Sequence, residues 1–277
     1  MAGVFDLDAY LARIGLGGRP SLAEVHLAHI TSIPFENLDP HRGLPVSLAV
    51  EDLERKLVRE RRGGYCFEQN LLLKAGLEAL GAEVEMMLAR VRVGAQPGAI
   101  RPRSHLLLRV RADGLDWHAD VGFGNGSLLE PLPWGAGEEQ AQSGWRFRIV
   151  AEGPELVLQT VRAGQWADVY AFLPQASPMV DLETSNWFTC THPRSPFVTG
   201  LIVSKQSGDG ARTTLSDWSG LALTQETPGG GAAVTAVEPG AVPELLAARF
   251  GLEGFDVDEN GRVIAAAAGE SAVAGPR

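Results

Sequence analysis

The sequence predicts an α+β protein in which helices come first and an antiparallel sheet or barrel follows. Two observations support this class. Apolar residues recur at helical spacing up to about Gly81, and after this glycine the period becomes strand-like. Several short strand-like segments then follow in series, and turn signals such as Asp113-Gly114 and Gly153-Pro154 separate them.

Two helices are expected before residue 63. The first begins after Ser21, which has Glu24 three residues later, the pattern of a capping box. The second covers residues 50–62, where apolar side chains recur at helical spacing, and the pair Gly63-Gly64 can end it.

Strands dominate the sequence after the helices. Six are expected in the middle of the chain, at residues 83–93, 104–114, 115–123, 145–153, 155–161 and 166–173. The last third is expected to combine two strands and one helix, at residues 200–206, 222–226 and 242–251. Residues 265–277 are of low complexity and are expected to form a frayed tail.

Length and composition describe a soluble globular protein. The chain has 277 residues, of which 45% are hydrophobic and 21% charged, so two or three domains or subdomains are expected. The sequence shows no apolar run that could span a bilayer and no signal peptide, so we expect no membrane partner. Two distant cysteines make neither a disulfide framework nor a zinc motif. We therefore expect the reducing cytoplasm and no metal.

The net charge of -10 argues against a nucleic-acid partner. A phosphate-bearing ligand would need a local basic patch. Candidates lie at residues 59–62 and at Arg101 and Arg103, although each arginine also fits a solvated surface.

Cys66 follows Gly63-Gly64 closely, at the expected start of a helix that runs to about Leu80 and ends at Gly81. A thiol at a helix N-terminus lies near unpaired backbone N–H groups and the positive end of the helix dipole, which favour the nucleophilic thiolate. The alternative is a buried cysteine that acts as a small apolar residue. The local pattern leaves both interpretations open.

A nucleophilic thiol needs a base, and His105 and His118 flank the expected turn at Asp113-Gly114. If these two residues form a two-residue turn, the register makes His105 and Asp120 diagonal neighbours on one face of the hairpin. A carboxylate there can hold an imidazole in one tautomer. His118 lies on the same face, so the geometry leaves both histidines open as the base. A slip of one residue would turn these side chains to opposite faces.

A glycine-rich run, "GFGNG" at residues 122–126, follows Asp120. Its backbone N–H groups can contact a pyrophosphate or an oxyanion. The run opens no clear helix, so it is not a dinucleotide fingerprint. A tight turn that leaves a strand explains it at least as well.

Five motifs together resemble the arylamine N-acetyltransferases. In chain order they are "IPFENLD" (33–39), "RGGYCFEQN" (62–70), "HLLLRV" (105–110), "DVGFG" (120–124) and "NWFTCTHPRSPF" (186–197). They cover most of the chain up to Phe197. One departure is visible: Cys190 stands where the family often has a serine before Thr-His-Pro, and we interpret it as a tolerated small residue.

The resemblance implies a fold in three parts. These are an N-terminal helical bundle at residues 1–82, a central antiparallel β-barrel at 83–195, and a C-terminal α/β lid with a flexible tail at 196–277. The core would be a Cys-His-Asp arrangement distantly similar to papain-like and transglutaminase proteins.

The resemblance also implies roles for single residues. Cys66 matches the family's nucleophile, His105 its base and Asp120 its orienting carboxylate, so the motif selects His105 over His118. Gly124 and Gly126 become candidates for contacts with CoA. Three phenylalanines match positions that line the family's acceptor pocket: Phe35, Phe123 and Phe197.

The implied activity is acetyl-CoA-dependent N-acetylation of arylamines, arylhydrazines or arylhydroxylamines, through a thioester on the cysteine. Acyl-CoA and a small aromatic amine are then the substrates, and no permanently bound cofactor is expected. The preferred amine, the preferred acyl donor and the oligomeric state stay open.

Three other functions fit parts of the pattern. An amide synthase that closes macrolactams from carrier-bound polyketide chains has the same fold and triad. A papain-like or transglutaminase-like hydrolase would pass its acyl-enzyme to water. A non-catalytic binding protein is the third alternative. The presence of Cys66, His105 and Asp120 argues against it, because a protein that only binds does not need all three.

Overall fold

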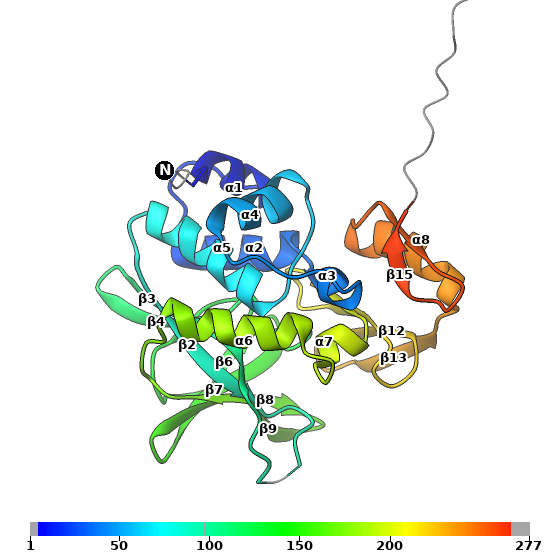
Figure 1. Cartoon of the computed structure of the whole chain (residues 1–277). Helices are drawn as coiled ribbons and strands as arrows, with labels where there is room; N and C mark the ends of the chain where they lie inside the picture. The colour runs from blue at the N-terminus through cyan, green and yellow to red at the C-terminus, as the bar shows by residue number, and fades with distance from the viewer. Residues whose placement is uncertain (1–4, 97, 267–277) are drawn as a thin grey trace, which may run out of the picture.

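The computed structural model describes residues 5–96 and 98–266 (Figure 1). In Figure 1 the helices of the first part lie above the large sheet that the strands of the middle part form, and the C-terminal elements lie to the right. Among the described residues, no helix is both long enough and apolar enough to cross a membrane. The class is therefore α+β, as the sequence predicts.

The first part of the chain is helical. Its elements are α1 (Leu7–Arg13), α2 (Leu22–Ser32), α3 (Leu38–His41), α4 (Val50–Leu53), the π-helical continuation η1 (Glu54–Arg59) and α5 (Cys66–Ala79). The capping box at the start of α2 is confirmed, because Ser21 N donates to Glu24 Oε2 at 2.8 Å and Glu24 N donates to Ser21 Oγ at 3.3 Å. The predicted extent of α5 is also confirmed, and Gly81 has a positive φ of 99°.

The helix predicted at residues 50–62 is shorter than expected. It ends at Arg59, because Arg61 adopts a positive φ of 54° and the chain then runs beside β1 (Phe35–Glu36). Gly63 and Gly64 do not end this helix. They allow the chain to pass close to Pro34 and Glu68, where a side chain at either position would collide.

The middle of the chain forms an eight-stranded antiparallel sheet that curls until it is nearly closed, with the strand order β5-β4-β3-β2-β9-β8-β7-β6. All six predicted strands are present, and β5 and β6 are additional. The strands are β2 (Glu83–Val91), β3 (Arg103–Ala112), β4 (Leu115–Ala119), β5 (Leu132–Pro133), β6 (Gln140–Gln142), β7 (Trp145–Glu152), β8 (Glu155–Arg162) and β9 (Gln165–Phe172).

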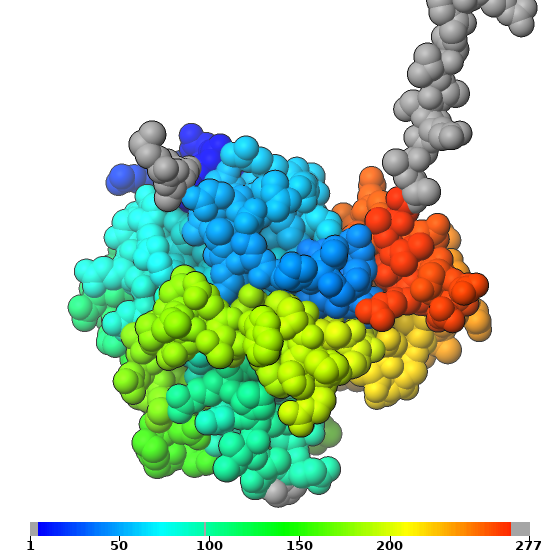
Figure 2. Space-filling view, in the orientation of Figure 1, coloured from blue at the N-terminus to red at the C-terminus, as the bar shows by residue number. Residues whose placement is uncertain are grey.

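Two helices that the sequence pattern did not predict follow the sheet, α6 (Met179–Thr191) and α7 (Pro196–Thr199). In Figure 2 this yellow-green segment lies across the junction between the blue helices and the green strands. Asn186 on α6 donates from Nδ2 to the carbonyl oxygen of Val46 at 2.9 Å, and α6 also packs against β3. The segment therefore covers one side of the junction between helices and sheet.

A second sheet contains four C-terminal strands and one strand from the N-terminal part, in the order β1-β10-β11-β12-β13, and β14 pairs with β15 in a separate two-stranded sheet. The predicted strands at 200–206 and 222–226 and the predicted helix at 242–251 are present. The elements are β10 (Ile202–Gln206), β11 (Arg212–Ser216), β12 (Ala222–Thr227), β13 (Gly231–Ala236), η2 (Pro239–Ala241), α8 (Val242–Leu245), η3 (Leu246–Phe250), β14 (Phe255–Val257) and β15 (Val263–Ala265). The predicted tail lies, from residue 267 on, outside the described residues.

Candidate active site

Cys66 is the first residue of α5, and its side chain is 3% exposed. The two glycines before it are required by packing. A Cβ atom on Gly63 would collide with the carbonyl oxygen of Pro34, and one on Gly64 would lie 2.7 Å from Glu68 Oε2. The close approach that these glycines permit fixes the start of the helix against β1.

His105 and Asp120 meet through the hairpin of β3 and β4. The predicted register is confirmed, because Ala112 pairs with Leu115 and the same pairing continues to Leu108 and Ala119. Beyond these pairs, His105 Nε2 lies 2.7 Å from Asp120 Oδ2. The expected proximity of these two side chains is thus observed.

Asp120 is surrounded by donors. Its Oδ1 accepts from Asn70 Nδ2 and from Gly122 N, each at 2.9 Å, and its Oδ2 accepts from the Tyr170 hydroxyl at 2.8 Å. Its own backbone N–H donates to His26 Nε2 at 3.2 Å. Burial by itself would raise the pKa of Asp120, but the neighbouring imidazole and these donors lower it to about 2. The carboxylate therefore keeps its negative charge at neutral pH.

His105 lies between this carboxylate and the thiol. Burial disfavours its cation, but the charge and hydrogen bond of Asp120 and a hydrogen bond with Cys66 outweigh burial and raise the pKa of His105 to about 10. Because Nε2 is bound to Asp120, Nδ1 is the ring nitrogen left for Cys66. The Cys66 Sγ also lies 3.6 Å from the carbonyl oxygen of Ser104. The arrangement can hold a proton beside the sulfur atom.

His118 and His26 lie near the same carboxylate but are held differently. Burial lowers the pKa of each to about 4, so both are neutral at pH 7. His118 Nε2 lies 2.8 Å from the Tyr170 hydroxyl, which stands between His118 and Asp120. The structure thus places His105, and not His118, in direct contact with Asp120.

Two partners of Asp120 were missed from the sequence. Asn70 lies four residues after Cys66 on α5, so both project from one side of the helix, and this spacing was an available signal. Tyr170 comes from β9, fifty residues along the chain from Asp120. Nothing in the local sequence around Tyr170 indicates this contact.

The three candidate phenylalanines fall into two groups. Phe123 meets the His105 ring edge-on, with centroids 5.1 Å apart, and also contacts Tyr170. Phe35 and Phe197 pack against each other with centroids 6.1 Å apart. The groups are connected through the loop after β4, since a Cβ atom on Gly124 would lie 3.3 Å from the Phe35 ring.

Gly124 and Gly126, the candidates for CoA contacts, are also explained by packing. Gly124 has a positive φ of 76°, a conformation that glycine adopts without strain. A Cβ atom on Gly126 would lie 2.7 Å from the Phe123 ring. The run at 122–126 is thus a tight loop against aromatic rings.

Two of the candidate basic residues are neutralised in the structure. Arg59 pairs with Glu54, and Arg62 Nη2 lies 2.7 Å from Glu36 Oε1. Arg101 donates to the carbonyl oxygens of Val93 and Gly94.

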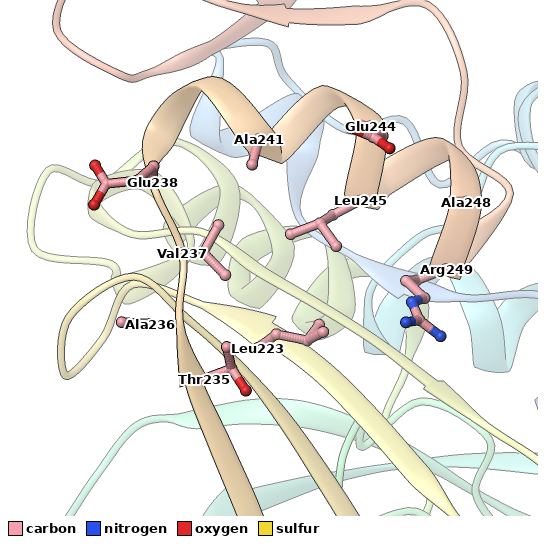
Figure 3. Close-up of a pocket in the computed structure, with 10 residues that line it drawn as sticks. All are labelled: Leu223, Thr235, Ala236, Val237, Glu238, Ala241, Glu244, Leu245, Ala248 and Arg249. Carbon is pink, nitrogen blue, oxygen red and sulfur yellow. The ribbon is translucent and has the colours of Figure 1, made fainter.

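A groove of about 590 Å³ lies away from this site, between β12, β13 and the helical segment of α8 and η3 (Figure 3). Its walls are largely apolar and bear three charged side chains, Glu238, Glu244 and Arg249. Cys66, His105 and Asp120 do not line it. Within the described ranges, no group of three histidine, cysteine or acidic side chains is arranged to hold a metal ion.

Comparison with known proteins places this site in a family. A family model described as N-acetyltransferase matches residues 20–257. An arylamine N-acetyltransferase of Mycobacterium bovis is 37% identical over 265 residues, which cover 92% of each chain. The chain belongs to the arylamine N-acetyltransferase family. The resemblance found in the five motifs is therefore confirmed.

Other members of the arylamine N-acetyltransferase family agree. A Mycolicibacterium smegmatis arylamine N-acetyltransferase is 42% identical over 213 residues, 74% of this chain and 78% of that one. The structure of the Mycobacterium marinum arylamine N-acetyltransferase in complex with CoA superposes with a TM-score of 0.83 at 38% identity, over 89% of this chain and 92% of that one. Because these relatives are arylamine N-acetyltransferases, the comparisons do not favour the amide synthase alternative.

Proposed function

We propose that this chain transfers the acetyl group of acetyl-CoA to an aromatic amine, hydrazine or hydroxylamine through a thioester on Cys66. The observation that carries the proposal is the chain of contacts from Asp120 Oδ2 through the His105 ring to Cys66. Cysteine, histidine and a carboxylate in this order form a nucleophile, its base and the group that orients the base. The relatives that bear the arylamine N-acetyltransferase name support the choice of substrates.

In the first half-reaction, the Cys66 thiolate attacks the thioester carbonyl of acetyl-CoA. The imidazolium of His105 favours this thiolate, as does the N-terminus of α5. Backbone N–H groups around Cys66 stabilise the oxyanion of the tetrahedral intermediate. The C–S bond to CoA then breaks, and CoA leaves as a thiol with the proton from His105.

In the second half-reaction, the amine nitrogen attacks the acetyl-cysteine. Neutral His105 takes the proton of the amine, and the sulfur atom leaves as a thiolate. This step restores the thiolate and the imidazolium. Asp120 keeps its charge throughout and holds the ring orientation.

The remaining assignments belong to the same proposal. Phe35, Phe123 and Phe197 would contact the ring of the acceptor. Aromatic rings prefer offset or edge contacts with one another, as Phe35 already makes with Phe197 and Phe123 with His105. Gly124 and Gly126 would let the donor approach the backbone closely.

We further propose that the chain works as three parts around a papain-like Cys-His-Asp core. Residues 1–82 supply the nucleophile, residues 83–195 contain the barrel that supplies the base and the carboxylate, and residues 196–277 contain the lid. Two observations support this division: Cys66 opens the last helix of the first part, and the β3–β4 hairpin of the second part brings His105 and Asp120 together.

Intact-protein mass spectrometry tests the proposal. Acetyl-CoA should add one acetyl group to the protein, and an aromatic amine should then remove it faster than water does. Cys66→Ser should abolish the adduct, whereas Cys190→Ser should retain it. Discharge by water at the same rate with and without the amine would indicate a hydrolase instead.

A further inference from the structure

The peptide group between Gly64 and Tyr65, just before the nucleophile, is held at both ends by side chains of the helix that follows it. Its carbonyl oxygen accepts from Gln69 Nε2 at 3.1 Å. Its N–H donates to Glu68 Oε2 at 3.1 Å. Glu68 and Gln69 are among the first four residues of α5, the helix that Cys66 opens. This helix therefore fixes the chain that leads into it.

Gln69 binds two carbonyl oxygens with one amide group. Its Nε2 also donates to the Pro34 carbonyl oxygen at 2.8 Å. Pro34 stands directly before β1, and the Gly64 N–H donates to the same oxygen at 3.4 Å. Both N–H groups of the amide are thus used, and the side chain is buried. Gln69 joins the end of α2, through Pro34, to the start of α5.

The remaining polar atom of Gln69, Oε1, lies 2.7 Å from His29 Nε2 on α2. An amide oxygen can only accept, so His29 Nε2 carries the proton. The other ring nitrogen, Nδ1, is then an acceptor, and the Tyr10 hydroxyl of α1 donates to it at 2.9 Å. Burial lowers the pKa of His29 to about 3 and raises the pKa of Tyr10, so the ring is neutral and the hydroxyl keeps its proton at pH 7. Donors and acceptors therefore match at every step.

Packing fixes this chain of hydrogen bonds, which we call the buried relay of Tyr10, His29 and Gln69. Tyr10 and His29 are both fully buried, and α1 and α2 both pack against α5 (Figure 1). Gly76 on α5 leaves room for the Tyr10 ring, because a Cβ atom there would collide with it. The relay thus connects three helices to the peptide group before Cys66.

We propose that Gln69 is a positioning residue that, through the buried relay, aligns the backbone N–H groups that stabilise the oxyanion at Cys66. This assignment rests on the proposed function and adds the side chains that hold its oxyanion site in place. The first N–H groups of a helix have no partner within the helix, so their direction depends on how the chain enters it. When the thiolate attacks a carbonyl carbon, a C–S bond forms and charge moves to the carbonyl oxygen. Donors that are already aligned lower this barrier.

The test compares two reactions of the same sulfur atom. Acylation by acetyl-CoA or p-nitrophenyl acetate passes through an oxyanion before CoA or p-nitrophenolate leaves. Alkylation by iodoacetamide displaces iodide from a saturated carbon atom and forms no oxyanion. Both reactions need the same thiolate, so the ratio of their rates isolates the oxyanion site. Intact-protein mass spectrometry at pH 7 measures both in single turnovers.

Three variants are compared. Gln69→Met replaces the amide with an apolar side chain of similar volume, and the two carbonyl oxygens keep their backbone donors. Tyr10→Phe removes one oxygen atom at the far end of the relay. Gln142→Met is the matched control, because Gln142 on β6 is also buried and also binds backbone N–H and carbonyl groups with its amide.

Gln69→Met should slow acylation by either donor about tenfold or more, since a small misplacement in an active site can cost about a hundredfold. Its alkylation should stay within about threefold of wild type, because the thiolate is retained. The acetyl-CoA concentration for half-maximal acylation should not change. Tyr10→Phe should lower the ratio of acylation to alkylation by about twofold or more. Gln142→Met should keep the wild-type ratio.

An unchanged ratio in Gln69→Met, whether both rates persist or both fall equally, would overturn the proposal, because a merely structural role predicts it. If Gln69→Met does not fold, Tyr10→Phe decides by the same criterion. A lowered ratio in Gln142→Met would also contradict the assignment. A failure of the proposed function looks different: acetyl-CoA would then not acylate wild type, whereas p-nitrophenyl acetate and iodoacetamide would still give the ratio.

Discussion

A Cβ atom on Gly122 would lie 2.7 Å from the Cα atom of Cys66. The loop after β4 therefore lies directly against the first turn of α5. Asp120, two residues before this glycine, is bound by Asn70 of the same helix at 2.9 Å. The missing side chain of Gly122 thus lets the hairpin that carries His105 pack closely against the helix that carries the thiol.

Gly122→Ala should therefore damage both folding and acylation. The added methyl group would also lie 2.6 Å from Asn70 Nδ2, so either the loop or the helix has to shift. Overpacking of this kind typically costs about 1–3 kcal/mol. We expect a lower free energy of unfolding in urea and a slower acylation of Cys66. Gly137→Ala is the control, because a Cβ atom there has no neighbour within 4 Å. Equal stability of the two variants would contradict this account.

The parts of the site that could be predicted are those that local rules determine. The Asp113-Gly114 turn sets the hairpin register, which brings His105 and Asp120 together. The glycine pair and Gly81 delimit the helix of Cys66. Each of these signals acts over a few residues, so a single sequence contains it.

The missed parts depend on contacts between distant segments. Tyr170 reaches Asp120 from β9, and β1 pairs with β10 across more than 160 residues. β13 is exposed along its whole length, so no alternation of apolar and polar residues indicates a strand. α6 follows the sheet without a side-chain hydrogen bond at its N-cap, Pro178.

Asp120→Asn should slow acetyl transfer far more than His118→Gln does. Asparagine keeps the shape of Asp120 but loses the charge that holds the His105 cation. If its amide N–H₂ group took the place of Oδ2, it would face the groups that now donate hydrogen bonds to this oxygen. The corresponding change in a serine protease lowers turnover by roughly 10⁴. Steady-state kinetics of both variants under one set of conditions measure this. A greater loss in His118→Gln would mean that the base has been misassigned.

Alkylation of Cys66 by iodoacetamide at pH 7 should be slower in Asp120→Asn than in wild type. The pKa of His105 is raised to about 10, so its cation persists at pH 7 and favours a negatively charged sulfur atom beside it. The variant loses the carboxylate that holds this cation. Mass spectrometry of the alkylated peptide measures both rates, and equal rates in the two proteins would refute the role of the His105 cation.

The same pKa shifts set the pH dependence of stability. The folded-state pKa of His105 is raised, so its contribution to the free energy of unfolding is complete below about pH 6.5 and is lost as pH rises through about 10. The pKa of Asp120 is lowered to about 2, so its contribution to the free energy of unfolding is complete above about pH 3.9 and is lost as pH falls through about 2. Unfolding in urea should show that wild type is less stable at pH 10 than at pH 6, and that this difference in stability is smaller in Asp120→Asn. An equal loss in both proteins would contradict the coupling.

Phe197 and Phe123 should affect different half-reactions. Phe197 contacts the rings of Phe35 and Tyr65, whereas Phe123 meets the ring of His105 itself. Truncating Phe197 to Ala removes acceptor contact worth about 0.5–1.5 kcal/mol beyond area burial, which corresponds to about two- to tenfold in rate. We expect this loss in the transfer to the amine and not in the acylation by acetyl-CoA. Phe123→Ala should slow both steps, because it also frees the His105 ring. Single-turnover kinetics resolve the two steps, and Trp187→Ala, at an exposed aromatic residue of α6, is the control. If Phe197→Ala slowed acylation as much as transfer, the ring would support the triad, and the acceptor would have to bind elsewhere.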